Sequence, residues 1–209
     1  LYSLINEHEK AMQYRLCAEG IAGQVRIAFH HESGFLCSST GSSAQPDVWG
    51  SAFAIYSGIL DESQVRKAAL TLLNAVKSGT IAWKGNIRHV PTDWDFSETT
   101  AWERTVNNYP INTYQNGAYW GTPTGWVCYA IAEVDEAAAR ALALEYVEEL
   151  REGDFRRGDE FGSPYECFHA DGDYHQNPVY LTSVSCPLAA FQRLGWTARD
   201  DINASVEIP

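Results

Sequence analysis

Two carboxylates are the strongest candidates for acid–base chemistry. Glu166 lies in a loop rich in proline and glycine, between Tyr165 and Phe168, whose rings could partly desolvate its carboxylate. Asp47 stands close to Trp49 at the start of a predicted helix, where aspartate is also a favoured N-cap. Because carboxylates with perturbed pKa values in clefts are candidates for catalysis, we predict catalytic roles for Glu166 and Asp47.

Side chains suited to binding hydroxyl groups lie near these carboxylates in the predicted fold. The segment "YQNGAYWGTPTGW", residues 114–126, places side-chain amides and large aromatic rings just ahead of an apolar run. Amides, aromatic rings and a few carboxylates around a cavity are typical of a site that binds polyols. The candidates for substrate binding are His89, Tyr114, Gln115, Asn116, Trp120, Trp126, His169, Gln176 and Asn177.

Three similar apolar segments are predicted to be buried helices. They are "QPDVWGSAFAIYSGIL" from Gln45, "QNGAYWGTPTGWVCYAIAEV" from Gln115 and "QNPVYLTSVSCPLAAFQRL" from Gln176. Each begins with residues typical of turns and helix starts, and each continues with apolar residues, many of them small. A helix that is apolar nearly all round is buried on several sides.

Amphipathic helices are predicted after the first two of these segments. Apolar residues recur at helical spacing from Val65 to Val76, and again at the same spacing from Ala139 to Leu150. Acidic pairs at residues 61–62 and 135–136 stand at the N-terminal ends of these helices, where negative charge is favourable. An earlier helix is predicted over residues 4–29.

This alternation of buried and amphipathic helices predicts an all-α fold in a single domain, residues 1–209. Helical hairpins repeating about every 70 residues in two layers indicate an α/α toroid. The long connections, residues 30–44, 79–114 and 153–175, all lead to the N-termini of inner helices and therefore gather on one rim. The stretch "IAWKGNIRHV" in the middle connection predicts a small β-hairpin in this rim.

Two of these stretches carry a resemblance to the six-hairpin glycosidase superfamily, the (α/α)6-toroid glycoside hydrolases. "YQNGAYWGTPTGW" is similar to the Asn-Gly-x-x-Trp segment of that group. "PYECFHADGDYHQNPVYLTSVSCPLAAF" resembles its Glu-aromatic-x-x-x-x-Gly segment and the last inner helix. The resemblance covers roughly residues 30–195 and implies the C-terminal half of an (α/α)6 barrel. The chain would then be a fragment of a longer catalytic domain that packs against a missing N-terminal half or another subunit.

The resemblance also implies an activity. Glycosidases of this group hydrolyse the glycosidic bond of an oligo- or polysaccharide with inversion, using one carboxylic acid and one carboxylate base. Glu166 occupies the position of the base. The acid would be Asp47, unless it lies upstream of Leu1. Further candidates for the acid are Asp93, Asp95, Glu98 and Glu103.

Other functions remain open. A sugar epimerase or uronate lyase on the same toroid would use His and Tyr as acid and base, with His89, His169, Tyr114 and Tyr165 as the candidates. A toroid could instead bind a glycan or a partner protein without turnover. Zinc bound by Cys167 and His169 would indicate a zinc-containing toroid, but we expect no metal because there is no second cluster of Cys or His.

Composition argues against several classes of partner. The net charge is −12, whereas a nucleic-acid-binding protein needs a basic face. No apolar run is long enough to span a bilayer, so we expect no membrane partner. The sequence has no phosphate loop, GxGxxG, HExxH or GxSxG motif, and we therefore expect no cofactor. With no targeting segment visible, the compartment is left open between cytoplasm and periplasm.

Overall fold

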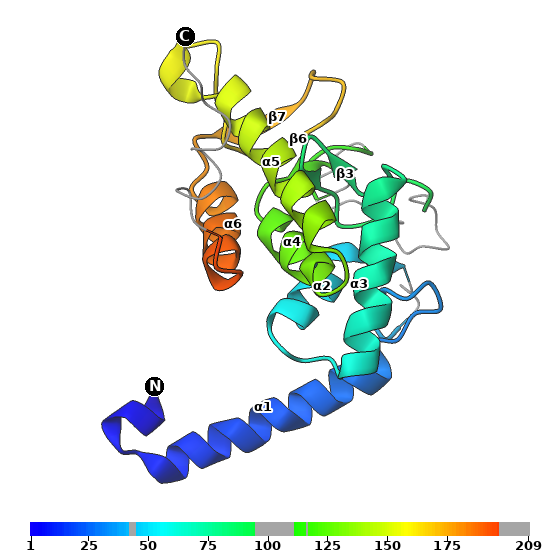
Figure 1. The fold of residues 1–209 in the computed structure, drawn as a ribbon, viewed down its shortest axis with the longest axis vertical. Coiled ribbons are helices and arrows are strands. Elements are labelled where there is room, and N and C mark those ends of the chain that lie inside the picture. The colour runs from blue at the N-terminus through cyan, green and yellow to red at the C-terminus, as the bar shows by residue number, and fades with distance from the viewer. Residues whose placement is uncertain (42–44, 95–110, 116, 197–209) are drawn as a thin grey trace.

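Helices make up most of the part of the chain that the structure describes. This computed structural model describes residues 1–41, 45–94, 111–115 and 117–196. Short 3₁₀ segments cover Tyr2–Ile5 and Phe155–Arg157. The α-helices are α1 (His8–Ala28), α2 (Val48–Tyr56), α3 (Glu62–Lys77), α4 (Thr124–Ala132), α5 (Glu136–Glu152) and α6 (Thr182–Arg193) (Figure 1).

Helix α4 is the centre of the helical core. It packs against α2, α3, α5 and α6, and its Val127, Cys128, Ala130 and Ile131 have no exposed surface. Its sequence is apolar on almost every side, as its central position requires. The prediction of buried helices in these apolar segments is confirmed for α2 and α4.

Helices α3 and α5 each bury one face. Leu72 in α3 and Leu142 in α5 are almost completely buried, whereas Leu144 in α5 is 60% exposed. Asp61 caps α3 by accepting a hydrogen bond from the backbone N–H of Gln64, and Asp135 caps α5 in the same way. These observations confirm the two predicted amphipathic helices and the acidic residues at their starts.

A five-stranded antiparallel sheet lies at one end of the helical core. Its order is β3 (Ala82–Trp83), β4 (Asn86–Ile87), β5 (Tyr119–Trp120), β6 (Tyr165–Phe168) and β7 (His175–Pro178). A separate two-stranded sheet pairs β1 (Leu36–Cys37) with β2 (Pro46–Asp47). The predicted hairpin in "IAWKGNIRHV" is confirmed as β3–β4, and its turn residues Lys84 and Gly85 both have positive φ, as a tight hairpin requires.

The prediction of an all-α fold is wrong, because the described chain combines helices with these two sheets. The classification as an α/α toroid fails with it. The segments from Gln115 and Gln176 were predicted to enter helices at once. Instead each first forms a strand, β5 or β7, and helix begins only at Thr124 or Thr182. Strands of two to four residues are too short to leave a periodic pattern in the sequence, and β5 pairs with β4 and β6, which are distant along the chain.

Helix α1 projects away from the rest of the molecule (Figure 1). None of its residues is buried, and large apolar side chains such as Met12, Leu16 and Ile21 are more than half exposed. Its C-terminal end is attached through Arg26, which donates to the carbonyl of Ile59 at 2.7 Å. The expectation that the chain packs against further protein remains a prediction. Among the described helices, none combines the length and apolarity needed to cross a membrane.

Candidate functional site

Residues from α2, β5, β6 and two loops, most of them aromatic, meet beside the sheet. Trp120 and Cys167 face each other across β5 and β6, and the Trp49 ring stands edge-on to Trp120 at 5.3 Å. Tyr114 and Tyr174 pack against the same residues. We call this group, Trp49, Tyr114, Ala118, Trp120, Cys167 and Tyr174, the aromatic cluster.

The two tryptophans of the aromatic cluster differ in their hydrogen bonds. Trp120 Nε1 donates to the carbonyl of Tyr114 at 3.3 Å. Trp49 Nε1 is buried and has no hydrogen-bond partner among the described residues. A buried N–H group without a partner costs free energy, so this indole is suited to donate to a ligand hydroxyl.

His89 stands edge-on to Trp49, with 5.5 Å between the ring centroids. Its backbone carbonyl accepts from the N–H of Val48, which ties the loop after β4 to the start of α2. Burial, assisted by the positive charge of Arg88, lowers the pKa of His89 to about 4. At neutral pH its imidazole is therefore uncharged.

Glu166 borders the aromatic cluster. It lies in β6 with 6% of its surface exposed, and its Oε2 accepts from Asn177 Nδ2 at 2.6 Å. Asn177 is the opposite residue on β7 and has a positive φ of 42°. Burial, followed by the negative charge of Glu166, raises the pKa of the Cys167 thiol to about 12. Glu166 therefore lies next to the aromatic cluster along β6, where it directly precedes Cys167.

Several predicted binding residues lie in the aromatic cluster or next to it. Tyr174 donates from its hydroxyl to Gln176 Oε1 at 3.3 Å, so Gln176 also borders the aromatic cluster. Side-chain amides, rings and a carboxylate are all present, as a polyol site would need. The predicted residues that the structure groups here are Glu166, Asn177, Gln176, Trp120, Tyr114 and His89.

Asp47 has the surroundings of a helix cap. Its carboxylate accepts from the backbone N–H of Gly50 at 2.7 Å at the start of α2. It lines an apolar groove between α1 and α2, together with Phe29 and Phe53. Burial raises the pKa of Asp47, although the backbone N–H groups of Gly50 and Trp49 oppose the shift. No contact among the described residues joins Asp47 to Glu166.

The remaining predicted residues lie elsewhere. Trp126 is inside α4 and packs edge-on against Phe53 at 4.9 Å, so it belongs to the contact between α2 and α4. Gln115 is exposed, and Asn116 lies outside the described residues. The His169 ring lies 3.3 Å from the Asp171 carboxylate, and the backbone N–H of His169 donates to the carbonyl of Tyr174. Of the further candidates for an acid, Asp93 is exposed, and Asp95, Glu98 and Glu103 lie outside the described residues.

A second feature, which the sequence did not predict, is a cleft of about 250 Å³ between the sheet and the end of α5. We call it the acidic cleft. Tyr165 and Phe168 of β6 line it, and Glu166 between them does not. Its lining comprises Trp83, Lys84, Glu149, Glu152, Gly153, Glu160, Phe161, Gly162, Tyr165, Phe168, His169, Gly172 and His175.

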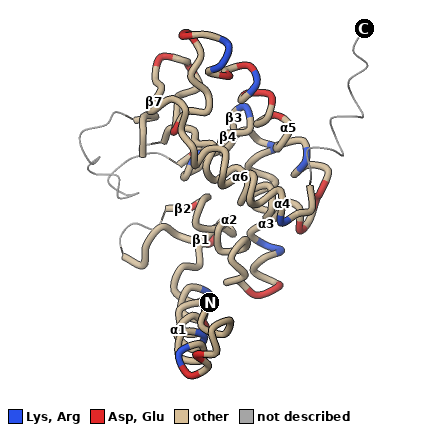
Figure 2. The backbone as a smooth tube through the Cα atoms, turned by 90° about the vertical axis from the view of Figure 1, so that its left-hand side faces the viewer, with Lys and Arg blue, Asp and Glu red and all other residues tan. Residues whose placement is uncertain are grey.

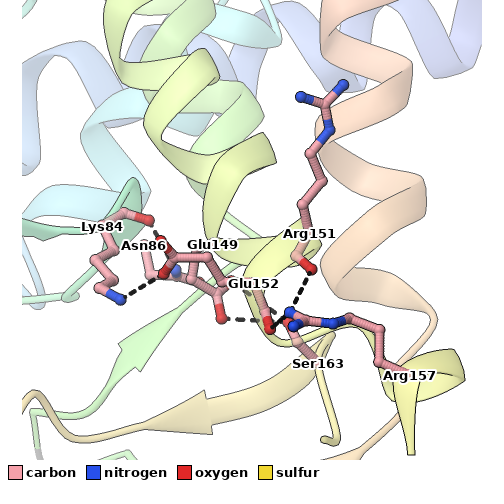
Figure 3. A network of polar contacts seen from close by, with 7 residues as sticks. All are labelled: Lys84, Asn86, Glu149, Arg151, Glu152, Arg157 and Ser163. Carbon is pink, nitrogen blue, oxygen red and sulfur yellow. Dashed lines mark hydrogen bonds and ion pairs between the residues drawn. The ribbon is translucent and has the colours of Figure 1, made fainter. Parts of the chain in front are cut away.

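Glu149 forms the centre of a hydrogen-bond network at this cleft (Figure 3). Ser163 Oγ donates to its two carboxylate oxygens at 3.2 and 3.4 Å, and the Asn86 side chain also bonds it. Burial raises the pKa of Glu149, which these hydrogen bonds only partly offset. From sequence alone, Glu149 reads as an ordinary surface residue of an amphipathic helix.

Comparisons with known proteins found no match. No protein-family model, no curated protein and no solved structure matches this chain. The described residues contain no group of three or more His, Cys, Asp or Glu side chains placed to hold a metal ion.

Proposed function

We propose that the chain binds a saccharide at the aromatic cluster and hydrolyses a glycosidic bond, with Glu166 as the general base. The observation that carries the proposal is a carboxylate, 6% exposed, next to a cluster of rings in which the buried Trp49 N–H has no partner among the described residues. Rings can stack on the apolar faces of sugars, and the indole and amides can hydrogen-bond to hydroxyl groups.

In this mechanism Glu166 accepts a proton from a water molecule. The water attacks the anomeric carbon as the glycosidic bond breaks, and the configuration inverts. Asn177 holds the carboxylate in one orientation through its 2.6 Å hydrogen bond. A second carboxyl group must protonate the leaving oxygen, about 6.5–9.5 Å from the base in inverting enzymes. Asp47 is the first to test, because burial raises its pKa and favours the protonated form.

The test is hydrolysis of a panel of oligosaccharides by the wild type and by Glu166→Gln. The variant keeps the size of the side chain and an oxygen that can accept from Asn177, so it should fold normally. Glu145→Gln, at an exposed position of α5, is the matched control. We expect turnover to be lost in Glu166→Gln only, and proton NMR to show the product first released as the inverted anomer.

One observation favours a second candidate, a sugar epimerase or uronate lyase that uses His89. The imidazole of His89 is neutral because its pKa is about 4, and it lies beside Trp49 at 5.5 Å. A neutral imidazole can accept a proton from a sugar carbon. In that case His89→Gln would abolish turnover, Glu166→Gln would retain it, and the product would be an epimer or an unsaturated sugar.

A further inference from the structure

The acidic cleft has properties of a binding site, and they do not depend on the function proposed for Glu166. Three carboxylates line it, from Glu149, Glu152 and Glu160, against the ammonium group of Lys84. Figure 2 shows acidic and basic residues alternating at the end of the molecule that carries β7 and the C-terminal part of α5. The lining itself is therefore net negative when its two histidines are neutral.

Aromatic rings form the walls of the acidic cleft. Phe168 stands edge-on to Trp83 at 5.4 Å, and Tyr165 lies 4.6 Å from His175. These rings come from β3, β6 and β7, so the sheet holds them in place. Ring faces beside carboxylates attract a cation more strongly than either group alone.

The cleft already holds one cation in this way. Lys84 Nζ lies 5.3 Å from the centre of the Trp83 ring and 2.8 Å from Glu152 Oε2. Arg157 packs on the ring of Phe161 at 4.4 Å, and it donates to the carbonyls of Arg151 and Glu152 at the end of α5 (Figure 3). Both basic side chains are therefore engaged at the edges of the cleft.

Glu149 forms no ion pair with either of these cations. Its hydrogen bonds come from Ser163 and Asn86, which are neutral, and it forms no ion pair among the described residues. Lys84 acts on Glu149 only through space, and the direct hydrogen bonds of this half-buried carboxylate come from neutral groups. Such a carboxylate is stabilised further when a positive charge pairs with it directly. Tyr165 and Phe168 line the same cleft as Glu149, so a cation held there would have both a carboxylate and ring faces around it.

We propose that the acidic cleft binds a primary ammonium group carried on a small sugar-sized body, as in an amino sugar. The ammonium would pair with Glu149, and the body would lie against the rings of Trp83, Tyr165 and Phe168. A neutral sugar of the same shape lacks the charge that this lining selects.

The test is titration of the wild-type protein at about pH 7 with glucosamine, glucose and N-acetylglucosamine. Chemical shifts of the Gly153 and Gly162 amides report binding, because both residues line the cleft. We expect saturable shifts with glucosamine and at least about tenfold weaker binding of the two neutral sugars. Nα-acetyl-lysine methylamide, whose side-chain ammonium group is free, is titrated as a second amine. Tighter binding of this probe would assign the cleft to a protein lysine, and weaker binding would assign it to an amino sugar.

Two substitutions locate the binding. Glu149→Gln should weaken the binding of glucosamine by about tenfold. Glu148→Gln should leave this affinity unchanged, because Glu148 is exposed and pairs with Arg151 at 3.7 Å. If Glu149→Gln fails to fold, Glu160→Gln, at the exposed edge of the cleft, should still weaken the binding of glucosamine measurably. Equal binding of glucose and glucosamine, no saturable binding of either amine, or an unchanged affinity in both cleft variants would overturn the proposal.

Discussion

Glu166 in β6 and Glu149 in α5 are both withdrawn from bulk water, yet their surroundings differ. Asn177 donates one hydrogen bond to Glu166. In the neighbouring aromatic cluster, Trp49 Nε1 has no hydrogen-bond partner among the described residues, and the Trp49 ring packs against the neutral His89. Ser163 and Asn86 both bond Glu149, and the charged side chains of Lys84 and Glu152 lie near it. The first environment leaves the buried N–H of Trp49 available to a ligand. The second has a net charge that a ligand could balance.

These differences suggest separate roles for two neighbouring regions, a reaction at the aromatic cluster and binding at the acidic cleft. β6 contributes to both regions, since Tyr165 and Phe168 line the acidic cleft and Cys167 belongs to the aromatic cluster. We infer that the aromatic cluster serves a reaction on a neutral sugar, and the acidic cleft serves binding of a positively charged group. The following predictions test whether the two regions differ in this way.

The largest expected effect is on turnover. Glu166→Gln should lower kcat by about 10²–10⁴-fold, because a missing general base costs that much. Its thermal unfolding midpoint should stay close to that of the wild type. Steady-state kinetics on the best oligosaccharide of the panel measures the loss, and Glu145→Gln serves as the control. Full activity in Glu166→Gln would remove the distinction between the two glutamates.

The next largest effect is the contribution of His89 to the pH dependence of the protein's stability. The unfolded chain protonates His89 below a pKa of about 6.5, but the folded chain does so only near 4. Stability should therefore fall as pH falls from about 6.5 to 4, by roughly 3 kcal/mol from this residue. Urea unfolding of the wild type and His89→Gln at several pH values measures it. Parallel stability curves for the two proteins would show that His89 is not buried in this way.

Substitutions of Asp47 should have a smaller effect on stability, and they distinguish a helix cap from a catalytic acid. Asp47→Ala should destabilise the protein by about 1 kcal/mol, because the hydrogen bond to the N–H of Gly50 is lost. Asp47→Asn should keep both stability and the cap, since asparagine is an equally good N-cap. Urea unfolding and turnover are measured on both variants. A stable Asp47→Asn protein with no turnover would instead identify Asp47 as the general acid.

For Glu149 the structure predicts a direction opposite to that of His89. Burial raises the pKa of Glu149, so the folded protein keeps this proton at pH values where the unfolded chain has lost it. Its contribution to stability is present below the unfolded pKa of about 4.5 and is lost as pH rises through the folded pKa. Glu149→Gln should therefore gain stability relative to the wild type as pH rises. The same urea series tests this, and a relative loss would contradict it.

The sequence predicted the helices better than the sheet because helices are encoded locally. The stripe from Val65 to Val76 and the caps at Asp61 and Asp135 are visible in the sequence, and α3 and α5 follow them. Tyr119 and Trp120 read equally well as the start of a helix. Their strand exists because Cys167 and Phe168 pair with them from nearly 50 residues away.

The candidate site was predictable in part for the same reason. Glu166 and Asn177 belong to one recognisable stretch, and they meet because β6 and β7 pair. The acidic cleft was not predictable, since Glu149, Trp83 and Ser163 come together only through the fold. Trp126 was predicted to bind substrate, but its ring packs against Phe53 between α2 and α4. An aromatic residue near the start of a helix suits a core contact as well as a binding site.

The role of Glu166 is tested most directly by a crystal structure of Glu166→Gln soaked with the oligosaccharide that the wild type hydrolyses best. We expect a sugar ring against Trp49 or Trp120, a hydroxyl group within about 3 Å of Trp49 Nε1, and the anomeric carbon facing residue 166. A sugar bound away from the aromatic cluster, with residue 166 out of reach of the glycosidic bond, would contradict the role given to Glu166.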